Sequence, residues 1–175
     1  MKRNDIHKCI DIITIAVIIS CSWGLLMNNI YCDSSKYFFS ALIIEDIKTT
    51  LCDVVKEEIV WRGLPLFSIS YVLSVIKYDS RKKKSVLCII SFVIILLVQI
   101  HFGIIHYNPI YEQECWKMRH IIWKGTMGLF YAISYNITQY YFNKQGMIQS
   151  HIIAYITTFF VHMLTDIVLI ASLTF

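Results

Sequence analysis

The sequence predicts an all-α membrane protein, a helix bundle with about five transmembrane helices and one further helix at the membrane interface. Hydrophobic residues make up 57% of the 175-residue chain and charged residues only 16%, and the charges are clustered. Several apolar stretches approach the ~20 helical residues that cross a hydrocarbon layer of ~30 Å. A soluble domain would not carry so many. We therefore expect a single membrane domain over residues 1–175.

The first two expected elements differ in character. An apolar span over 10–27 follows a basic start and resembles a signal peptide in outline, but we expect it to be retained because further spans follow. The segment 37–55 mixes apolar residues with charged ones, so a helix there has a polar face. We expect that helix to lie at the membrane interface rather than to cross.

Four further spans complete the bundle. Gly63 and Pro65 interrupt the first of them, and because proline breaks the helical hydrogen-bond ladder, the sequence predicts a kink just after Arg62. Turn signals such as Asn108-Pro109 separate the later spans. The four spans are expected over residues 57–77, 86–106, 120–141 and 150–175.

Charge predicts how the bundle is oriented. The strongest basic run, 81–84, marks a cytoplasmic loop under the positive-inside rule. We expect an integral membrane protein with the amino terminus and the 77–85 loop in the cytoplasm. The net charge of +4 indicates orientation and contact with anionic lipid. A nucleic-acid partner is not expected, because no basic groove with interleaved aromatic residues is present.

Polar pairs at one-turn spacing recur in three of the apolar segments. Ionisable side chains are costly in a bilayer and usually functional, and the expected topology brings the three pairs to similar depth. The sequence therefore predicts one convergent polar site. Its members are Glu57 and Glu58 with Arg62, Phe102 with His106, and His162 with Asp166.

The first two pairs suggest how water is activated. Residues four apart share a helix face, so Arg62 lies over Glu58 and an ion pair between them would brace the helix. Glu57 points about 100° away and is the freer carboxylate. Glu57 is therefore the candidate general base on water, and His106 could share that water or shuttle its proton.

The third pair suggests stabilisation of charge. Hydrolysis of a carbonyl compound needs donors for the oxyanion that develops, and His162 with Asp166 one turn later could supply them. An ionised carboxylate only accepts hydrogen bonds, so Asp166 must be protonated or must orient His162 instead. Phe102 is expected to pack and to shape the pocket wall.

From 51 to 175 the chain resembles the CAAX protease and bacteriocin-processing family of membrane endopeptidases, also called the Abi family. The resemblance rests on Glu-Glu-x-x-x-Arg, Phe-x-x-x-His and His-x-x-x-Asn/Asp in that order. It implies a glutamic-type intramembrane peptidase in which Glu57 and His106 activate water, while His162 and Asp166 form the oxyanion site. The implied substrate is a hydrophobic or lipidated peptide, and no cofactor is implied.

Two other functions stay open. Glu57, His106, His162 and Asp166 are acceptable zinc ligands, so a zinc-dependent membrane protease could use the same residues, although the His-Glu-x-x-His signature is absent. The chain could also be a non-catalytic immunity or regulatory protein that binds a toxin or a sensor partner. Such a protein would need none of the proposed catalytic residues.

Several other residues carry structural expectations. Gly125 and Gly128 should let two helices approach closely. Cys32 and Cys115 fall in outward connections and could form a disulfide, but free thiols are expected, and the six cysteines form no Cys-x-x-Cys motif. Three histidines match no motif and are expected at the interface near the span ends: His101, His120 and His151.

Overall fold

The computed structural model describes residues 3–31, 44–76, 81–106 and 116–174. These ranges form helices joined by short turns and contain no strand, so the all-α prediction is confirmed for them. The elements are α1 (Arg3–Tyr31), α2 (Ile44–Glu58), a π-helical turn (Ile59–Gly63), α3 (Leu64–Val75), α4 (Arg81–Ile105), α5 (Trp116–Phe142), a 3-10 turn (Asn143–Gln145) and α6 (Met147–Thr174).

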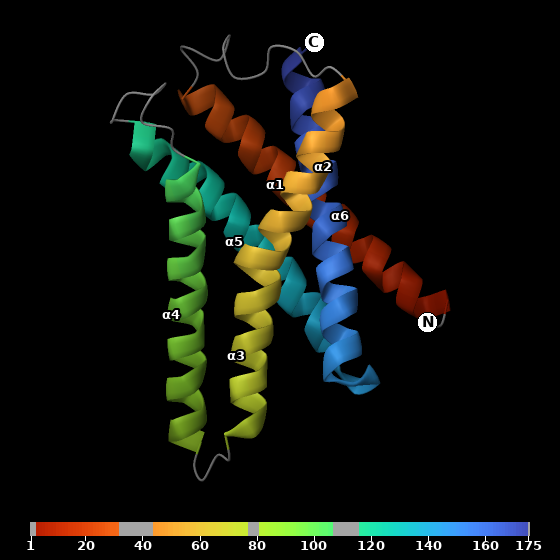
Figure 1. The fold of residues 1–175 in the computed structure, drawn as a ribbon, viewed down its shortest axis with the longest axis vertical. Helices are drawn as coiled ribbons and strands as arrows, with labels where there is room; N and C mark the ends of the chain where they lie inside the picture. Colours follow the sequence, from red (N-terminus) through yellow and green to blue (C-terminus); the bar gives the residue numbers. More distant parts are fainter. Residues whose placement is uncertain (1–2, 32–43, 77–80, 107–115, 175) are drawn as a thin grey trace.

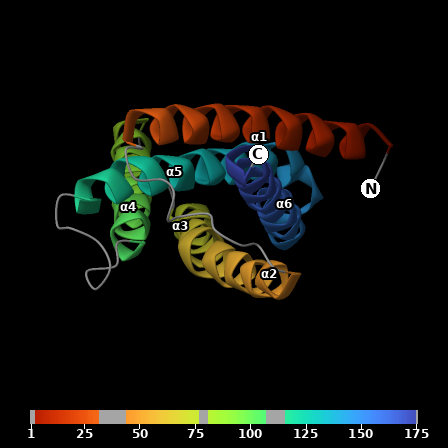
Figure 2. The same ribbon diagram turned by 90° about the horizontal axis from the view of Figure 1, so that it is seen from above.

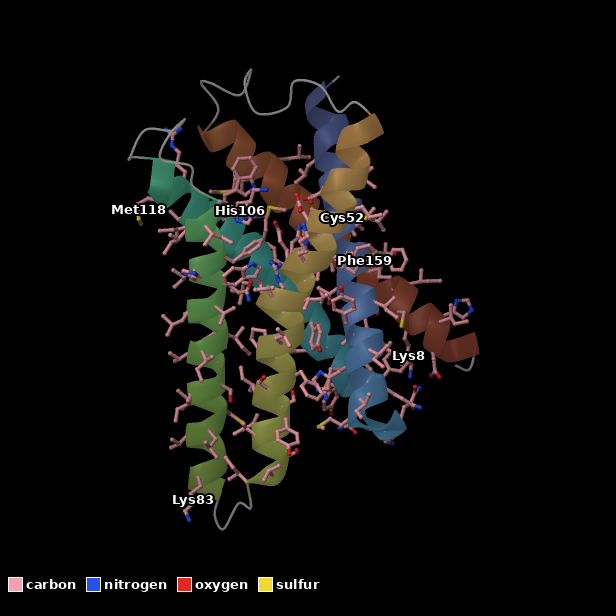
Figure 3. All side chains as sticks on the ribbon, in the orientation of Figure 1. Lys8, Cys52, Lys83, His106, Met118 and Phe159 are labelled. Carbon is pink, nitrogen blue, oxygen red and sulfur yellow. The ribbon has the colours of Figure 1, made fainter. Side chains whose placement is uncertain are left out.

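Successive helices alternate in direction. In Figure 1, α1, α4 and α6 run upward, whereas α2 with α3 and α5 run downward. Lys83 and His106 mark the lower and upper parts of α4 (Figure 3). α5 packs against α1, α4 and α6 and lies near the middle of the bundle when seen from above (Figure 2). This alternation is the one expected from the five predicted helices.

Three helices are long and apolar enough to cross a membrane: α1 over 5–27, α4 over 85–105 and α6 over 147–169. They correspond to the predicted spans 10–27, 86–106 and 150–175. The predicted span 57–77 does not qualify, because its α-helix has only 12 residues, or about 18 Å. α5, at 120–141, is long enough but carries Lys124 and other polar residues. Length and composition thus support three of the five predicted spans.

The predicted boundary between an interfacial helix at 37–55 and a span at 57–77 is wrong for the described residues. Helical structure continues from Ile44 to Val75, and residues 37–43 lie outside the described ranges. Nothing interrupts the helix near Lys56, which forms an exposed ion pair of 3.2 Å with Asp53 on the same face. α2 therefore continues directly into the segment that carries Glu57 and Glu58.

The α-helix is interrupted by a π-helical turn, Ile59–Gly63, which ends directly after Arg62, where the sequence predicts a kink. Pro65 has no N–H, and its ring crowds the carbonyl of Trp61 four residues before it. The π turn relieves that crowding. Gln99 from α4 then donates its Nε2 to the Trp61 carbonyl at 3.1 Å. A side chain of a neighbouring helix thereby satisfies the carbonyl that proline leaves without a partner.

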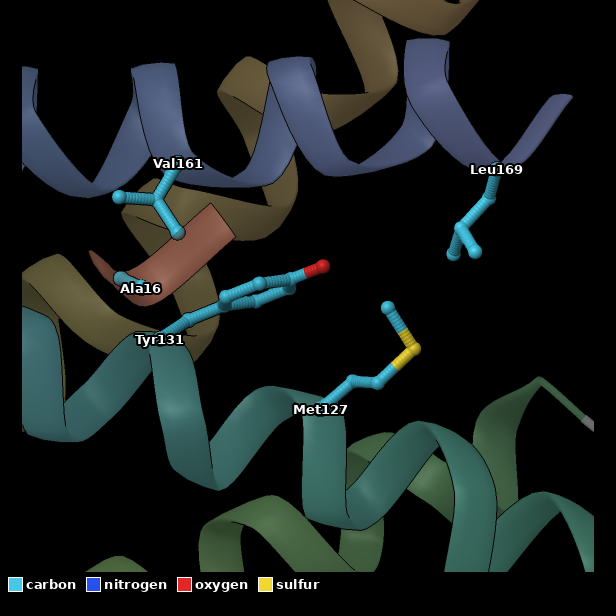
Figure 4. Close-up of a cluster of buried hydrophobic side chains, with 5 residues drawn as sticks. All are labelled: Ala16, Met127, Tyr131, Val161 and Leu169. Atoms are coloured by element: carbon cyan, nitrogen blue, oxygen red, sulfur yellow. The ribbon is translucent and has the colours of Figure 1, made fainter. Parts of the chain in front are cut away.

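The core is built where α5 meets α1 and α6. One buried cluster combines five residues of these three helices (Figure 4), namely Ala16, Met127, Tyr131, Val161 and Leu169. A second cluster lies around α3, α5 and α6 and contains Leu66, Ala132, Tyr135 and Ala154. Together they hold α6, which carries two of the predicted site residues, against α5.

Glycines set the distance between α4 and α5, as predicted. A Cβ atom at Gly125 would lie 3.0 Å from the carbonyl oxygen of Gln99. At Gly128 it would lie 2.5 Å from Gln99 Oε1 and 2.9 Å from Arg62 Nη2. Because any larger residue would push the helices apart, these glycines allow α5 to form one wall of the polar site.

Candidate active site

The seven predicted site residues lie together where α2, the π turn, α4 and α6 meet. Glu57 and Glu58 end α2, and Arg62 is in the π turn. Phe102 and His106 come from the last turns of α4, near its upper end in Figure 3. His162 and Asp166 are one turn apart on α6. The expected convergence of three separate motifs is therefore present.

Glu57 stands between two imidazoles. Its Oε1 lies 3.6 Å from His106 Nε2, and its Oε2 lies 3.8 Å from His162 Nε2. Both separations exceed an ordinary direct hydrogen bond. The Glu57 side chain is 27% exposed, so water can reach it. A carboxylate in this position can take a proton from a water molecule shared with either ring.

His106 is fixed by its own helix. Its Nδ1 lies 2.7 Å from the carbonyl oxygen of Phe102, which can only accept a hydrogen bond. A neutral His106 therefore carries its proton on Nδ1 and turns the Nε2 lone pair toward Glu57. The Phe102 ring packs edge-on against the imidazole with centroids 4.4 Å apart and is buried. Phe102 thus forms pocket wall, as predicted.

His162 is held by carboxylates on both sides. Its Nδ1 lies 2.8 Å from Glu58 Oε1, and its Nε2 lies 3.3 Å from Asp166 Oδ2. A ring protonated at both nitrogens would donate to both carboxylates. This geometry favours the second of the two roles considered for Asp166, namely orienting His162.

Glu58 and Arg62 form the expected ion pair, with Nη1 and Oε1 3.1 Å apart and both side chains fully buried. The guanidinium also lies over the rings of Phe102 and Tyr131, at 4.1 and 5.2 Å from their centroids. Aromatic faces attract a cation and partly replace the water lost on burial. Glu58 Oε1 is shared between Arg62 and His162, a connection that the spacing alone did not predict.

These side chains surround a cavity of about 190 Å³. That is room for about six waters at the volume each occupies in the liquid. Glu57, His106, His162, Asp166 and Phe102 line it. Five further residues complete the lining: Asp53, Val54, Lys124, Met127 and Tyr131.

Lys124 and Tyr131 are site residues that the sequence analysis missed. Lys124 is close enough to Asp166 for their charges to interact. The Tyr131 ring stacks on His162 with centroids 4.5 Å apart. Their spacing of seven residues places both on one face of α5, together with Met127. A polar face on an otherwise apolar helix is the signal that could have identified them.

His151 has a defined partner inside the bundle. It is buried, and its Nδ1 lies 2.8 Å from the Tyr135 hydroxyl. Of the other two unassigned histidines, His101 is exposed, and the side chain of His120 lies outside the described part.

The described cysteines, Cys9, Cys21, Cys52 and Cys88, are free. Cys32 and Cys115 lie outside the described ranges. Over the described residues, no group of three or more His, Cys, Asp or Glu side chains is placed to hold a metal ion.

The fold and the site define a helical protein with three helices long and apolar enough to cross a membrane and a partly buried cluster of histidines and carboxylates around a small cavity. Protein-family models, curated proteins and solved structures contain no match to this chain.

Proposed function

We propose that this chain is a glutamic-type intramembrane endopeptidase that cleaves a hydrophobic or membrane-associated peptide. The observation that carries the proposal is the position of the Glu57 carboxylate, between His106 Nε2 and His162 Nε2 in one small cavity. The resemblance of the three motifs to the CAAX protease and bacteriocin-processing family supports the same reading.

The proposed reaction begins with a water held between Glu57 and His106. Glu57 takes a proton as the water oxygen bonds to the carbonyl carbon of the scissile peptide, and the carbonyl electrons move to its oxygen. The proton on His162 Nε2, which faces Asp166 Oδ2 at 3.3 Å in this structure, turns to that oxyanion once the substrate is bound and stabilises it. The carbon–nitrogen bond then breaks, and the proton taken by Glu57 passes to the leaving nitrogen, directly or through His106.

The other side chains of the site have supporting roles, which follow from their contacts. Glu58, paired with Arg62, holds the Nδ1 side of His162, so the Nε2 side stays directed at the cavity. Asp166 steadies the same ring from the next turn of α6. Phe102, Met127 and Val54 supply apolar wall that suits a hydrophobic substrate.

The membrane setting is part of the proposal. We place α1, α4 and α6 across a prokaryotic cell membrane, with the amino terminus and the 77–85 loop in the cytoplasm. Support comes from the three long apolar helices and from the basic run 81–84 at the start of α4. Two further crossings, by the α2–α3 segment and by α5, would complete the five-span arrangement.

Glu57→Gln and His106→Ala test the water-activation step. Removing a general base or its partner typically costs about 10²–10⁴-fold in rate. We expect losses of that size when purified protein in proteoliposomes is incubated with a pool of synthetic transmembrane-like peptides and the products are identified by mass spectrometry. His101→Ala is the matched control, because His101 is exposed on α4 and lies outside the cavity lining.

Undiminished cleavage by either variant would remove the proposal. Cleavage that survives chelator treatment and metal analysis would exclude the zinc-dependent alternative, whereas loss restored by zinc would favour it. The non-catalytic alternative holds if two results are found together. The wild-type protein cuts none of the peptides, and variants with changed motif residues still bind a toxin or sensor partner.

A further inference from the structure

A second cavity, of about 500 Å³, lies between α1 and α5. None of its lining residues lines the candidate active site. Most of its wall is apolar and comes from one face of each helix, with Ile12, Ile15 and Ile19 on α1 and Phe130, Ile133 and Ile137 on α5. We call this cavity the α1–α5 groove.

The α1–α5 groove has the length of half a bilayer. On α1 its lining extends from Lys8 to Ile19, which is about 16 Å at the helical rise per residue. A hydrocarbon core of ~30 Å gives each leaflet about the same depth. The candidate span of α1 begins at Asp5, so the groove starts near the membrane boundary and extends inward along a helix that is inclined to α4 and α6 (Figure 1).

Only the boundary end of the groove is charged, and it carries both signs. Lys8 and Asp11 are three residues apart, so they are neighbours on one helix face, and both line the groove. The Lys8 ammonium lies 5.7 Å from the centroid of the Tyr141 ring. Tyrosine favours the membrane–water interface, which agrees with this end being at headgroup depth.

A phosphatidylethanolamine headgroup carries the matching pair of charges, a phosphate next to a primary ammonium. The phosphate would face Lys8, and the ammonium would donate hydrogen bonds to the Asp11 carboxylate. Phosphatidylglycerol has no cation for Asp11. The quaternary ammonium of phosphatidylcholine has no N–H to donate.

We propose that the α1–α5 groove binds one phosphatidylethanolamine molecule, with an acyl chain along the isoleucines and the headgroup between Lys8 and Asp11. The rival occupant is a helix, from a second copy of the chain or from another protein. A helix is 10–12 Å across with its side chains, and seating one there would bury Lys8 and Asp11 away from water at a high cost. A zwitterionic headgroup instead pairs with both.

The experiment is native mass spectrometry of the full chain released from nanodiscs that contain equal amounts of phosphatidylethanolamine, phosphatidylglycerol and phosphatidylcholine. We expect phosphatidylethanolamine to be retained about fivefold over either competitor, the scale of a partly exposed charge pair. Asp11→Asn should abolish that preference, and Lys8→Arg should keep it. Ile133→Trp should fill the groove and reduce retention, whereas Ile89→Trp on the exposed face of α4 should not.

Three results would overturn the proposal. They are equal retention of the three lipids, a preference for phosphatidylglycerol, and a dimer that Ile133→Trp dissociates. Lys8, Asp11 and Ile133 are exposed side chains, so these variants should fold, and thermal unfolding checks that they do. The inference rests on the proposed membrane placement of α1, but the readout needs no peptidase activity, so failure of lipid binding is distinguishable from failure of the proposed peptidase function.

Discussion

Among single residues, Glu58 connects the most parts of the site. One of its oxygens, Oε1, accepts from both Arg62 and His162, at 3.1 and 2.8 Å. The pair with Arg62 is fully buried, so neither charge has water to replace a lost partner. Glu57, its neighbour, is partly exposed in the cavity. The two adjacent glutamates thus differ in role: Glu58 is structural, and Glu57 is the proposed general base.

Arg62→Met should destabilise the protein strongly. It leaves the Glu58 carboxylate buried without its cation, which typically costs about 3–5 kcal/mol. Unfolding in detergent micelles, followed by circular dichroism, measures this. Lys56→Met is the control, because it breaks an exposed pair worth about 0–1 kcal/mol.

Adding Glu58→Gln to Arg62→Met removes the stranded charge and should recover part of the loss. If Arg62→Met costs no more than Lys56→Met, the buried pair does not brace this part of the fold.

Helical spacing was enough to predict the seven motif residues, because ionisable side chains stand out in apolar segments. It could not predict that His162 bonds to Glu58. The choice between adjacent glutamates depends on how α2 is rotated against α6, which is a tertiary property. Lys124 and Tyr131 were missed for a related reason, since which face of α5 meets the site depends on where α5 packs.

At the level of elements, the close contact of α4 with α5 decides the shape of the site. Gly128 faces Gln99, Phe102 and Arg62 with no room for a methyl group. Gln99 meanwhile holds the Trp61 carbonyl at the π turn. The helix contact, the turn and the ion pair therefore share one small region.

Gly128→Ala should destabilise the fold by about 1–3 kcal/mol, the usual cost of overpacking. The added Cβ would lie 2.5 Å from Gln99 Oε1. The free energy of unfolding is measured for Gly128→Ala, for Gln99→Ala and for the double variant. In the double variant, the shorter side chain at position 99 makes room for the added methyl group. The double variant should lose less than the sum of the two single losses. Simple additivity would contradict this packing.

Helix positions were largely predictable, because apolar stretches of membrane length leave few alternatives. The join of α2 to α3 was not. The sequence shows that Pro65 must interrupt the α-helical hydrogen bonds. It does not show that a π turn forms before the proline, or that Gln99 donates a hydrogen bond to the Trp61 carbonyl. The charged residues of 44–58 suggested an interfacial helix separate from the span that follows. The segment contains no helix-terminating residue, so α2 continues into the π turn.

For the whole molecule, the alternating helix directions have a consequence for sidedness. Lys83, at the start of α4, lies at the lower end of the bundle, and α5 begins at the upper end near Met118 (Figure 3). α5 runs downward, and Lys144 is in the 3-10 turn that follows it (Figure 1). If α4 crosses a membrane, these positions must face opposite sides.

Lys83→Cys and Lys144→Cys should react with a membrane-impermeant thiol reagent from one side, and Met118→Cys from the other. Each cysteine is placed singly in a cysteine-free version of the chain, and labelling of intact cells is compared with labelling of inverted vesicles. The proposed orientation places Lys83 in the cytoplasm. Labelling of Lys83→Cys and Met118→Cys from the same side would mean that α4 does not span the membrane.

The π turn Ile59–Gly63 also governs helical phase. A π turn accommodates one residue more than an α turn, so that extra residue rotates α2 by about 100° relative to α3. Deleting one residue there would restore a regular helix and swing Glu57 away from His106 by the same angle. At positions other than Arg62, the segment should accept substitutions of side chains more readily than any change in its length.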